Sequence, residues 1–399
     1  MGTWESRFAG RMGRIKSSAI REILKVTQQP GIISFAGGLP APDLFPLEAM
    51  RRAADKVLGQ YGAAALQYST TEGHPPLREW VAAGLPNTTP DQVLITTGSQ
   101  QALDLVGKLF IGAGDEVVVE SPTYLGALQS FTPYEPEYLT VPMDQGGMVV
   151  EALEQTLKTH RPKFIYALPS FQNPTGRHMD LARRKRLVEV ARRYDVPLLE
   201  DDAYHHLAFS GQTLPTLYEL DQELGGGNVI YQSTFSKTLS PGLRVAWVVG
   251  PREVVSRLVQ LKQGADLHTP TLNQMLMYEL AQTVLPELVV KIRNTYRERR
   301  DLMLAALEQH LAKEAHWNKP EGGMFLWLEI PEGLDSAELL KKAVEQRVAF
   351  VPGQPFHPDG SGANTMRLSF SNASPEDIRV GIERLGQAVR SMLRVVSRP

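Results

Sequence analysis

Between residues 46 and 285 the chain alternates short apolar runs with amphipathic helical segments. The apolar runs are Val93–Thr96, Val117–Val119, Phe164–Leu168, Pro197–Glu200, Val229–Tyr231 and Val245–Val249. Because these runs are nearly continuous and do not alternate with polar residues, they are typical of strands that are covered on both faces. The pattern predicts an α/β fold, in which a mainly parallel sheet lies between two layers of helices. Ligands of such sheets bind at the carboxyl ends of the strands.

The segments on either side predict two further units. Residues 1–45 are expected to form an arm that packs with the small domain and the active site, and that contains a short helix capped by two serines. The apolar face of that helix consists of Ile20, Ile23, Leu24 and Thr27. A long helix is predicted over residues 286–315, and residues 286–399 indicate a smaller α+β domain. The strands expected there are Gly323–Leu328, Val348–Val351 and Met366–Phe370.

Composition excludes several classes of protein. The formal charge of −2 offers no electrostatic footprint for nucleic acid or an anionic membrane. The densest basic runs, Arg183–Arg186 and Arg297–Arg300, fall in helical patterns and are predicted to face solvent. The absence of cysteine excludes disulfides, thiolate chemistry and sulfur-ligated metals. No segment approaches the ~18 apolar residues of a membrane span, and no signal sequence is visible, so we expect a cytoplasmic protein.

Lys237 is the residue that most strongly suggests chemistry. It lies in the hydroxyl-rich run Ser233–Arg244, seven residues before the arginine that ends that run. An amine can form a Schiff base with an aldehyde, while a guanidinium and hydroxyls donate to a phosphate. The run therefore favours an aldehyde cofactor that carries a phosphate. The alternative is that Lys237 is an ordinary solvated charge.

Polar groups also follow the first predicted strand. Gly98 and Ser99 precede Gln100 at the start of a predicted helix, where free N–H groups and the helix dipole would suit a phosphate. An ordinary N-cap is the simpler interpretation of this stretch taken alone. Neither a P-loop nor a dinucleotide fingerprint is present, so a nucleotide is the weaker phosphate candidate.

Three acidic residues, Glu200, Asp201 and Asp202, end another predicted strand. They could form a magnesium site, although the phosphate loop that accompanies such sites is missing. One carboxylate could instead pair with a pyridinium nitrogen and keep its ring electron-poor. A solvated loop is the third interpretation.

Three more side chains complete the pattern. Asn173 opens an Asn-Pro-Thr-Gly turn, and its amide could donate to a phenolate oxygen. Tyr124 follows a predicted strand and could stack on a planar cofactor, although a lone tyrosine is more often part of a core. Arg367 stands between apolar neighbours in a predicted strand and requires a carboxylate, either from the protein or from a substrate. The adjacent His205 and His206 diverge and cannot chelate one ion, so no metal is expected.

Together and in this order, these motifs resemble the fold-type I pyridoxal-phosphate aminotransferases of class I/II. The resemblance covers nearly the whole chain, and it predicts a large domain with a mainly parallel sheet plus a smaller α+β domain. It implies that Lys237 forms the Schiff base with pyridoxal 5'-phosphate and acts as the catalytic base. Asp201 would pair with the pyridine nitrogen, Asn173 and Tyr204 would bind the phenolic oxygen, and Tyr124 would stack on the ring. The phosphate would be held by Ser99, Gln100, Thr234, Ser236 and Arg244.

The resemblance also implies substrate contacts and a partner. Arg367 would bind the substrate α-carboxylate, with Asn173 and Gly38 beside it. Tyr68 would reach the phosphate and substrate of the neighbouring subunit, which implies a homodimer with shared active sites. Arg21 could bind a distal carboxylate, or it could simply be solvated.

Within this family the chain is similar to the α-aminoadipate aminotransferase (LysN-like) branch and to the kynurenine/aminoadipate enzymes. The segments that carry this similarity are Arg14–Leu24, Phe35–Pro42 and Gln263–Pro270. The expected reaction moves the amino group of 2-aminoadipate or glutamate to a 2-oxo acid such as 2-oxoglutarate, in ping-pong order. Broad aromatic, branched-chain or kynurenine specificity is the alternative. A pyridoxal-phosphate lyase or synthase, or a non-catalytic sensor domain, is the third possibility.

Overall fold

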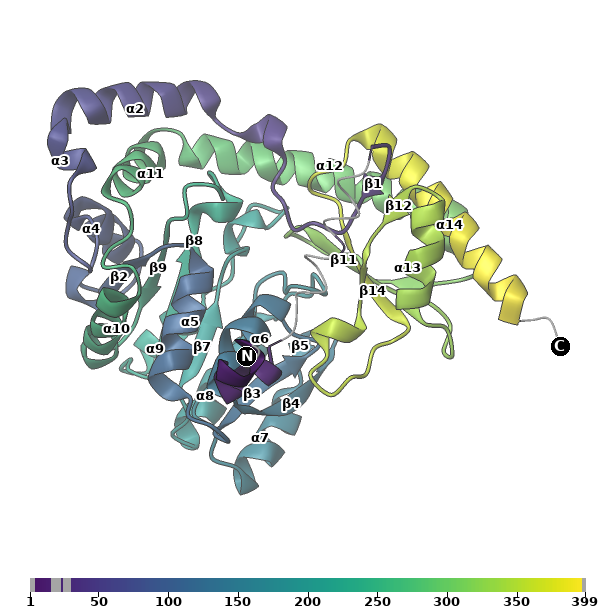
Figure 1. Cartoon of the computed structure of the whole chain (residues 1–399), viewed down its shortest axis with the longest axis horizontal. Coiled ribbons are helices and arrows are strands. Elements are labelled where there is room, and N and C mark those ends of the chain that lie inside the picture. Colours follow the sequence, from purple (N-terminus) through teal and green to yellow (C-terminus); the bar gives the residue numbers. More distant parts are fainter. Residues whose placement is uncertain (1–3, 16–22, 24–29, 397–399) are drawn as a thin grey trace.

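The computed structural model describes residues 4–15, 23 and 30–396, and an eight-stranded sheet forms the centre of its larger part (Figure 1). The strands lie in the order β2 (Val93–Thr96), β9 (Ala246–Val249), β8 (Val229–Thr234), β7 (Leu198–Asp201), β6 (Ile165–Ala167), β3 (Glu116–Ser121), β4 (Glu137–Asp144) and β5 (Gly147–Met148). Neighbours from β8 to β4 pair in parallel, whereas β9 and β5 are antiparallel to their neighbours. The prediction of a mainly parallel sheet is therefore confirmed.

Helices cover both faces of this sheet because its strands are apolar on both sides. In β2, for example, Val93 and Ile95 join one buried cluster and Leu94 joins the other. The helices on the Leu94 side are α5 (Ser99–Phe110), α6 (Leu125–Phe131) and α10 (Arg252–Ala265). Those on the opposite side include α4 (Pro75–Ala83), α7 (Val150–Thr159), α8 (Leu181–Arg193), α9 (Leu217–Glu223) and α11 (Thr271–Thr283).

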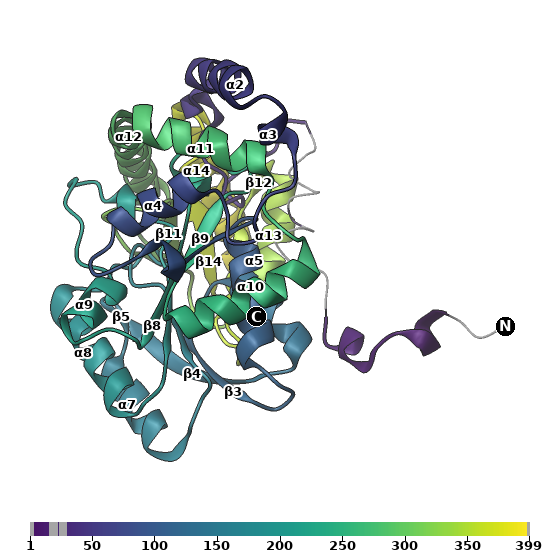
Figure 2. The same cartoon turned by 90° about the vertical axis from the view of Figure 1, so that its left-hand side faces the viewer.

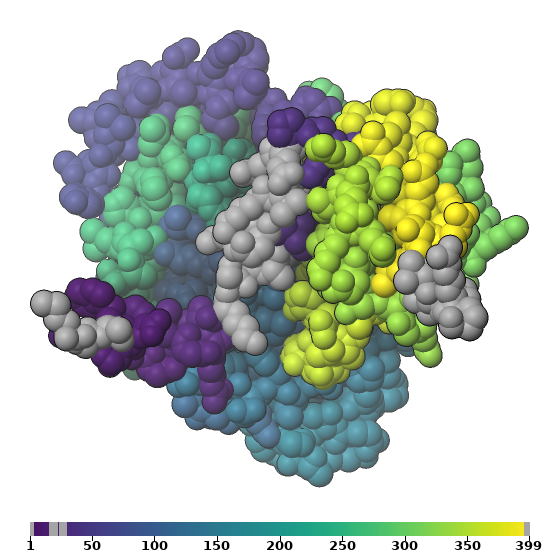
Figure 3. Space-filling view, turned by 45° about the vertical axis from the view of Figure 1, so that its right-hand side comes forward, coloured from purple at the N-terminus to yellow at the C-terminus, as the bar shows by residue number. Residues whose placement is uncertain are grey.

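A second, antiparallel sheet has the order β10 (His316–Trp317), β11 (Phe325–Glu329), β14 (Thr365–Ser369) and β13 (Val351–Pro352). The helices α13 (Ser336–Glu345) and α14 (Pro375–Val396) pack beside it, and the long helix α12 (Leu285–Leu311) runs along both parts (Figure 1). The C-terminal part of the chain, coloured yellow-green to yellow, gathers on one side of the molecule (Figure 3). A short parallel pair, β1 (Ile33–Ser34) with β12 (Val348–Ala349), ties the segment before the large sheet to this smaller part. The predicted combination of a large α/β unit and a small α+β unit is confirmed.

Two further helices, α2 (Leu47–Tyr61) and α3 (Ala63–Leu66), precede the large sheet, and residues 4–15 project from the body (Figure 2). An ion pair joins Arg14 Nε to Glu135 Oε1 at 3.5 Å. Most of the predicted arm helix lies outside the described residues, except Ile23, which is buried in a cluster with Trp327 and Phe356. The domain limits at residues 45 and 285 stay predictions.

The prediction that both basic runs face solvent is wrong at three arginines. Arg184 is fully buried and donates to the carbonyl oxygens of Met179, Pro169 and Pro215. Arg299 and Arg300 are also buried, and their guanidinium groups donate to backbone carbonyls, those of Ser371 and Pro320 respectively. The helical pattern identified the correct helices. Charge alone, however, does not reveal that loop carbonyls buried inside the protein require hydrogen-bond donors.

Within the part of the chain that the structure describes, no helix combines the length and the apolar character needed to cross a bilayer.

The two arginines of one run should differ in their effect on stability. Arg184→Ala leaves several buried carbonyls without a donor, so we expect the unfolding free energy to fall by roughly 3 kcal/mol. Arg186 is partly exposed and pairs with Glu154 at 2.6 Å, so Arg186→Ala should cost less than about 1 kcal/mol. Urea denaturation of both variants measures the difference. Equal losses would contradict the assigned role of Arg184.

Candidate active site

A cavity of about 240 Å³ lies at the carboxyl edge of the large sheet, where the chain leaves β2, β3, β6, β7 and β8. Because these strands run in the same direction, residues distant in sequence meet at this edge. The second sheet adds Arg367 from β14 to its wall. Its lining comprises Gly37, Gly38, Leu39, Ser99, Gln100, Tyr124, Leu168, Asn173, Asp201, Ala203, Tyr204, Thr234, Ser236, Lys237, Pro241, Arg244 and Arg367.

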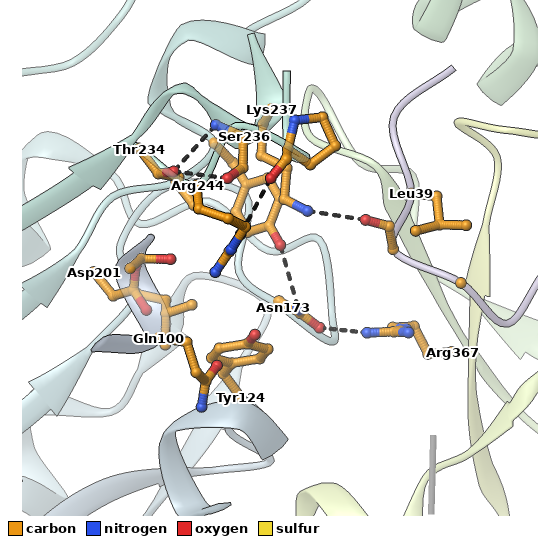
Figure 4. Close-up of a pocket in the computed structure, with 17 residues that line it drawn as sticks. Leu39, Gln100, Tyr124, Asn173, Asp201, Thr234, Ser236, Lys237, Arg244 and Arg367 are labelled. Atoms are coloured by element: carbon orange, nitrogen blue, oxygen red, sulfur yellow. Dashed lines mark hydrogen bonds between the residues drawn. The ribbon is translucent and has the colours of Figure 1, made fainter. Parts of the chain in front are cut away.

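Hydrogen-bond donors gather on one side of the cavity (Figure 4). Thr234 and Ser236 stand at the end of β8, and their hydroxyls are 2.9 Å apart. Arg244 lines the cavity with them, and its guanidinium lies against Gly98. Helix α5 begins here with Gly98 as its N-cap, and no side chain caps it among the described residues. The N–H groups of its first turn, at Ser99 and Gln100, are therefore available to an anion.

Backbone conformation holds the Gly98 turn and Arg244 close together. Gly98 has a φ of 81°, and a Cβ atom built on it would lie 2.1 Å from Arg244 Nη2, so only glycine fits there. Arg244 itself has a φ of 54°, in the left-handed region that residues with a Cβ rarely adopt. Such conformations cluster at binding sites, where the surrounding structure maintains them.

Lys237 extends into the middle of the cavity. Its Nζ donates to the carbonyl oxygen of Gly38 at 2.9 Å. Burial, together with the nearby charges of Arg367 and Arg244, lowers the pKa of Lys237 to about 8. A larger fraction of this amine is therefore neutral, and hence nucleophilic, near neutral pH than of an ordinary lysine.

Asp201 lies on the cavity floor and accepts a hydrogen bond from Tyr166 Oη at 2.7 Å. Burial raises the pKa of Asp201 to about 6, although the Tyr166 hydrogen bond acts in the opposite direction. A cation beside this carboxylate would stabilise its charged form.

The neighbouring acids are not the solvated loop that the sequence left open, because both are buried. Glu200 accepts from the N–H groups of Leu217 and Tyr218 and so caps α9. Asp202 accepts from Tyr231 Oη at 3.1 Å. Only Asp201 among the three acids lines the cavity.

A chain of hydrogen bonds crosses the opposite wall. Asn173 Nδ2 donates to Tyr204 Oη at 3.2 Å, and Arg367 Nη1 donates to Asn173 Oδ1 at 2.8 Å. Arg367 is buried, its guanidinium lies over the rings of Phe325 and Phe356, and its Nε has no hydrogen-bond partner among the described residues. A buried guanidinium with an unused donor is suited to a carboxylate.

Some of the predicted site residues differ in whether and how they line the cavity. Tyr124 lines the cavity, but the side-chain amide of Gln100 donates to Gly126 and Ser130. Tyr68 does not line the cavity, and the residue is 79% exposed. Arg21 lies outside the described residues.

Sequence reasoning missed Gln172 and Tyr166, which support the site from behind. Gln172 Nε2 donates to Pro122 O at 2.8 Å, and its Oε1 accepts from Thr175, so it ties the Asn173 turn to the Tyr124 loop. The only feature of the sequence that could have indicated Gln172 is its position directly before Asn173 of the Asn-Pro-Thr-Gly motif.

Within the described residues, no group of three or more histidine, aspartate or glutamate side chains is placed to hold a metal ion. The rings of His205 and His206 meet edge to face and lie outside the cavity.

Comparison with known proteins agrees with this arrangement. The model of the family "Aminotransferase class I and II" matches residues 32–385. A 2-aminoadipate transaminase of Thermus thermophilus is 50% identical over 99% of both chains, and an aromatic-amino-acid aminotransferase of Thermococcus litoralis is 42% identical over 98% of this chain and 96% of its own.

A solved structure shows the same fold. LysN, the α-aminoadipate aminotransferase of Thermus thermophilus in complex with N-(5'-phosphopyridoxyl)-L-leucine, superposes with a TM-score of 0.94 at 49% identity, covering 98% of this chain and 100% of its own. The chain therefore belongs to aminotransferase class I and II, the pyridoxal 5'-phosphate-dependent transaminases of fold type I.

Proposed function

We propose that this aminotransferase takes the amino group of 2-aminoadipate or glutamate and passes it to a 2-oxo acid, with 2-oxoglutarate as the usual acceptor. One observation carries the proposal: the amine of Lys237, the carboxylate of Asp201 and the guanidinium of Arg367 face a single cavity. The full-length similarity to a 2-aminoadipate transaminase supports the choice of substrate.

The residues of the cavity fit the cofactor. The α5 N-terminus, Arg244 and the hydroxyls of Thr234 and Ser236 match a phosphate, and the close approach at Gly98 leaves that side without an intruding side chain. Asp201 suits a pyridinium, Asn173 and Tyr204 suit a phenolic oxygen, and Tyr124 supplies an aromatic face. Ser99 and Gln100 would contribute their backbone N–H groups.

Lys237 has two tasks in this proposal. Its amine would hold the cofactor covalently, and as a free base it would remove the proton from the substrate Cα. The lowered pKa serves both tasks, because a neutral amine can attack a carbonyl and accept a proton. When bound, pyridoxal phosphate supplies an electron sink for the electrons released at Cα, and Asp201 favours this by keeping the ring nitrogen protonated.

Arg367 orients the substrate through its α-carboxylate. The guanidinium is desolvated and fixed by Asn173 and by the carbonyl oxygen of Ala36, 2.6 Å from Nη2. An incoming carboxylate would compete with these two oxygens for the guanidinium N–H groups. It would also accept a hydrogen bond from Nε, which has no partner among the described residues. Gly38 lines the same wall and would contact the substrate.

The second carboxylate of 2-aminoadipate or glutamate is assigned to Arg21 on the family resemblance alone. Broad specificity for aromatic or branched amino acids is the second candidate, favoured by the aromatic-amino-acid aminotransferase among the relatives.

We further propose a homodimer in the cytoplasm. Tyr68 and Leu66 are both largely exposed, and Tyr68 does not reach the cavity of its own chain. A second copy would bury these side chains and bring Tyr68 to its phosphate and substrate sites. The proposed arm of residues 1–45 and the domain boundary at residue 285 belong to the same hypothesis.

A panel of amino donors tests the function. With the cofactor-loaded enzyme, 2-aminoadipate and glutamate should give the matching oxo acid and pyridoxamine phosphate in equal amounts. Arg21→Ala should lower kcat/KM for both donors by roughly tenfold or more, because a charged hydrogen bond is lost, and leave leucine within about twofold. Arg14→Ala, a control in the same proposed arm, should leave kcat/KM for all three donors unchanged. Loss of all donors alike in Arg21→Ala would contradict the specificity, and products without pyridoxamine phosphate would contradict transamination.

The acidity of Lys237 can be measured without turnover. In cofactor-free protein, competitive labelling with acetic anhydride should reach half its maximal rate near pH 8 at Lys237, well below the ~10.4 of a free lysine side chain. Below that pH the amine is protonated and unreactive. Arg367→Gln should move the Lys237 midpoint upward, because removal of a nearby positive charge stabilises the ammonium. A wild-type midpoint at the value of a free lysine side chain, ~10.4, would contradict the account.

A further inference from the structure

Lys262 is a fully buried cation that the proposed chemistry does not use. It lies on α10, is 0% exposed and does not line the cavity. Its Nζ lies 2.7 and 2.9 Å from the two carboxylate oxygens of Asp266, and it donates to Gln101 Oε1 at 2.7 Å. All three donors of the ammonium are therefore directed into one cluster.

The cluster surrounds the turn that starts α5. Thr97 Oγ1 donates to Asp266 Oδ2 at 2.6 Å, and Thr97 N donates to the same Gln101 oxygen that accepts from Lys262, at 2.8 Å. Thr97 Oγ1 also lies 3.0 Å from Thr269 Oγ1. Both the backbone and the side chain of Thr97 are thus held from the side away from the cavity.

This turn has to be held at a defined distance from Arg244. The residue after Thr97 is Gly98, whose backbone contacts the Arg244 guanidinium, and the next residues, Ser99 and Gln100, carry the free N–H groups of α5. Since hydrogen bonds to a phosphate depend on donor positions to within a fraction of an ångström, a shift of Thr97 would weaken all of them together.

Burial of the Lys262 ammonium at this position costs desolvation free energy. Burial lowers the pKa of Lys262, and only its contacts with Asp266 oppose that shift. An apolar side chain of similar length would avoid the desolvation. This buried ion pair lies directly behind the phosphate-type donors, and its hydrogen bonds converge on the first turn of α5.

We propose that Lys262 and Asp266 form a positioning pair that fixes the Thr97–Gln101 turn so that its N–H groups and Arg244 bind the cofactor phosphate. Neither residue of the pair touches the cofactor. The inference rests on the proposed function, because it assumes a phosphate at this end of the cavity.

The loop that contains Asp266 also contacts Tyr68. His268 meets the ring of Tyr68 edge to face, with the ring centroids 5.8 Å apart. Thr269, between this histidine and α11, is fully buried. The residue two positions after Asp266 therefore contacts the tyrosine proposed to reach the partner's phosphate.

Cofactor-free protein distinguishes this role from a general structural one. Binding of pyridoxal 5'-phosphate and of pyridoxal, which lacks the phosphate, is measured by absorbance titration in wild type and in Lys262→Met. We expect the dissociation constant of the phosphorylated compound to rise roughly tenfold or more, and that of pyridoxal to change less than about twofold. Calorimetry with inorganic phosphate should show a parallel loss.

Arg192→Met is the matched control. Arg192 forms an ion pair with the buried Asp221, which binds the N–H groups of Asn228 and Val229 at the start of β8, the end opposite the cavity. This variant should lower the unfolding midpoint and leave the ratio of the two dissociation constants at its wild-type value. Should Lys262→Met fail to fold, Thr97→Val removes only the hydroxyl link and should change the ratio in the same direction by a smaller factor.

The possible outcomes distinguish a failure of the positioning role from a failure of the proposed function. Equal losses for both compounds in Lys262→Met, or an unchanged ratio in Lys262→Met or in the folded Thr97→Val protein, would overturn the positioning role. Failure of the wild-type protein to bind pyridoxal 5'-phosphate at all would instead overturn the proposed function.

Discussion

The site depends on the partial burial of one lysine amine, that of Lys237. Lys237 sits at the edge where parallel strands end, beside the positive charges of Arg367 and Arg244 and with Gly38 O as its acceptor. Burial and like charge both favour the neutral amine, while Asp201 limits the shift. An exposed lysine in the same loop would be almost fully protonated at neutral pH and a poor nucleophile. The fold therefore contributes to the chemistry through its desolvation of this group.

Both sheets supply residues to the cavity around Lys237. The large sheet supplies the phosphate-type donors, Asp201 and Lys237, while β14 of the smaller sheet supplies Arg367. The turn that starts at Asn173 joins them, because Asn173 accepts from Arg367 and Gly176 approaches Phe325 so closely that a Cβ atom would lie 2.4 Å from its carbonyl oxygen.

The sequence was sufficient for the elements that obey simple periodicity. Continuous apolar runs located six adjacent strands of the large sheet, and β2 was predicted with the observed limits, Val93–Thr96. The pair β4 and β5 was missed, because β4 is half exposed and has polar and proline residues that hide its pattern. Residues grouped in short motifs, such as Asn173 and Lys237, were found to meet at one cavity, since parallel strands bring their ends together.

What the sequence could not reveal was which charged side chains are buried. Arg184, Lys262 and Glu200 are of the same residue types as surface charges, and only the three-dimensional positions of their acceptors or donors make burial tolerable. Each of them satisfies backbone or side-chain groups that are distant in sequence. Such partners have no periodic signature, so the supporting layer behind a site is harder to predict than the site itself.

The most direct test of the central claim is to locate the covalent bond. Protein reconstituted with pyridoxal 5'-phosphate is reduced with borohydride and digested, and the modified peptide is sequenced by mass spectrometry. The account predicts one pyridoxyl group per chain on Lys237, and none after Lys237→Ala under the same conditions. Labelling of a different lysine, or equal labelling in the variant, would contradict it.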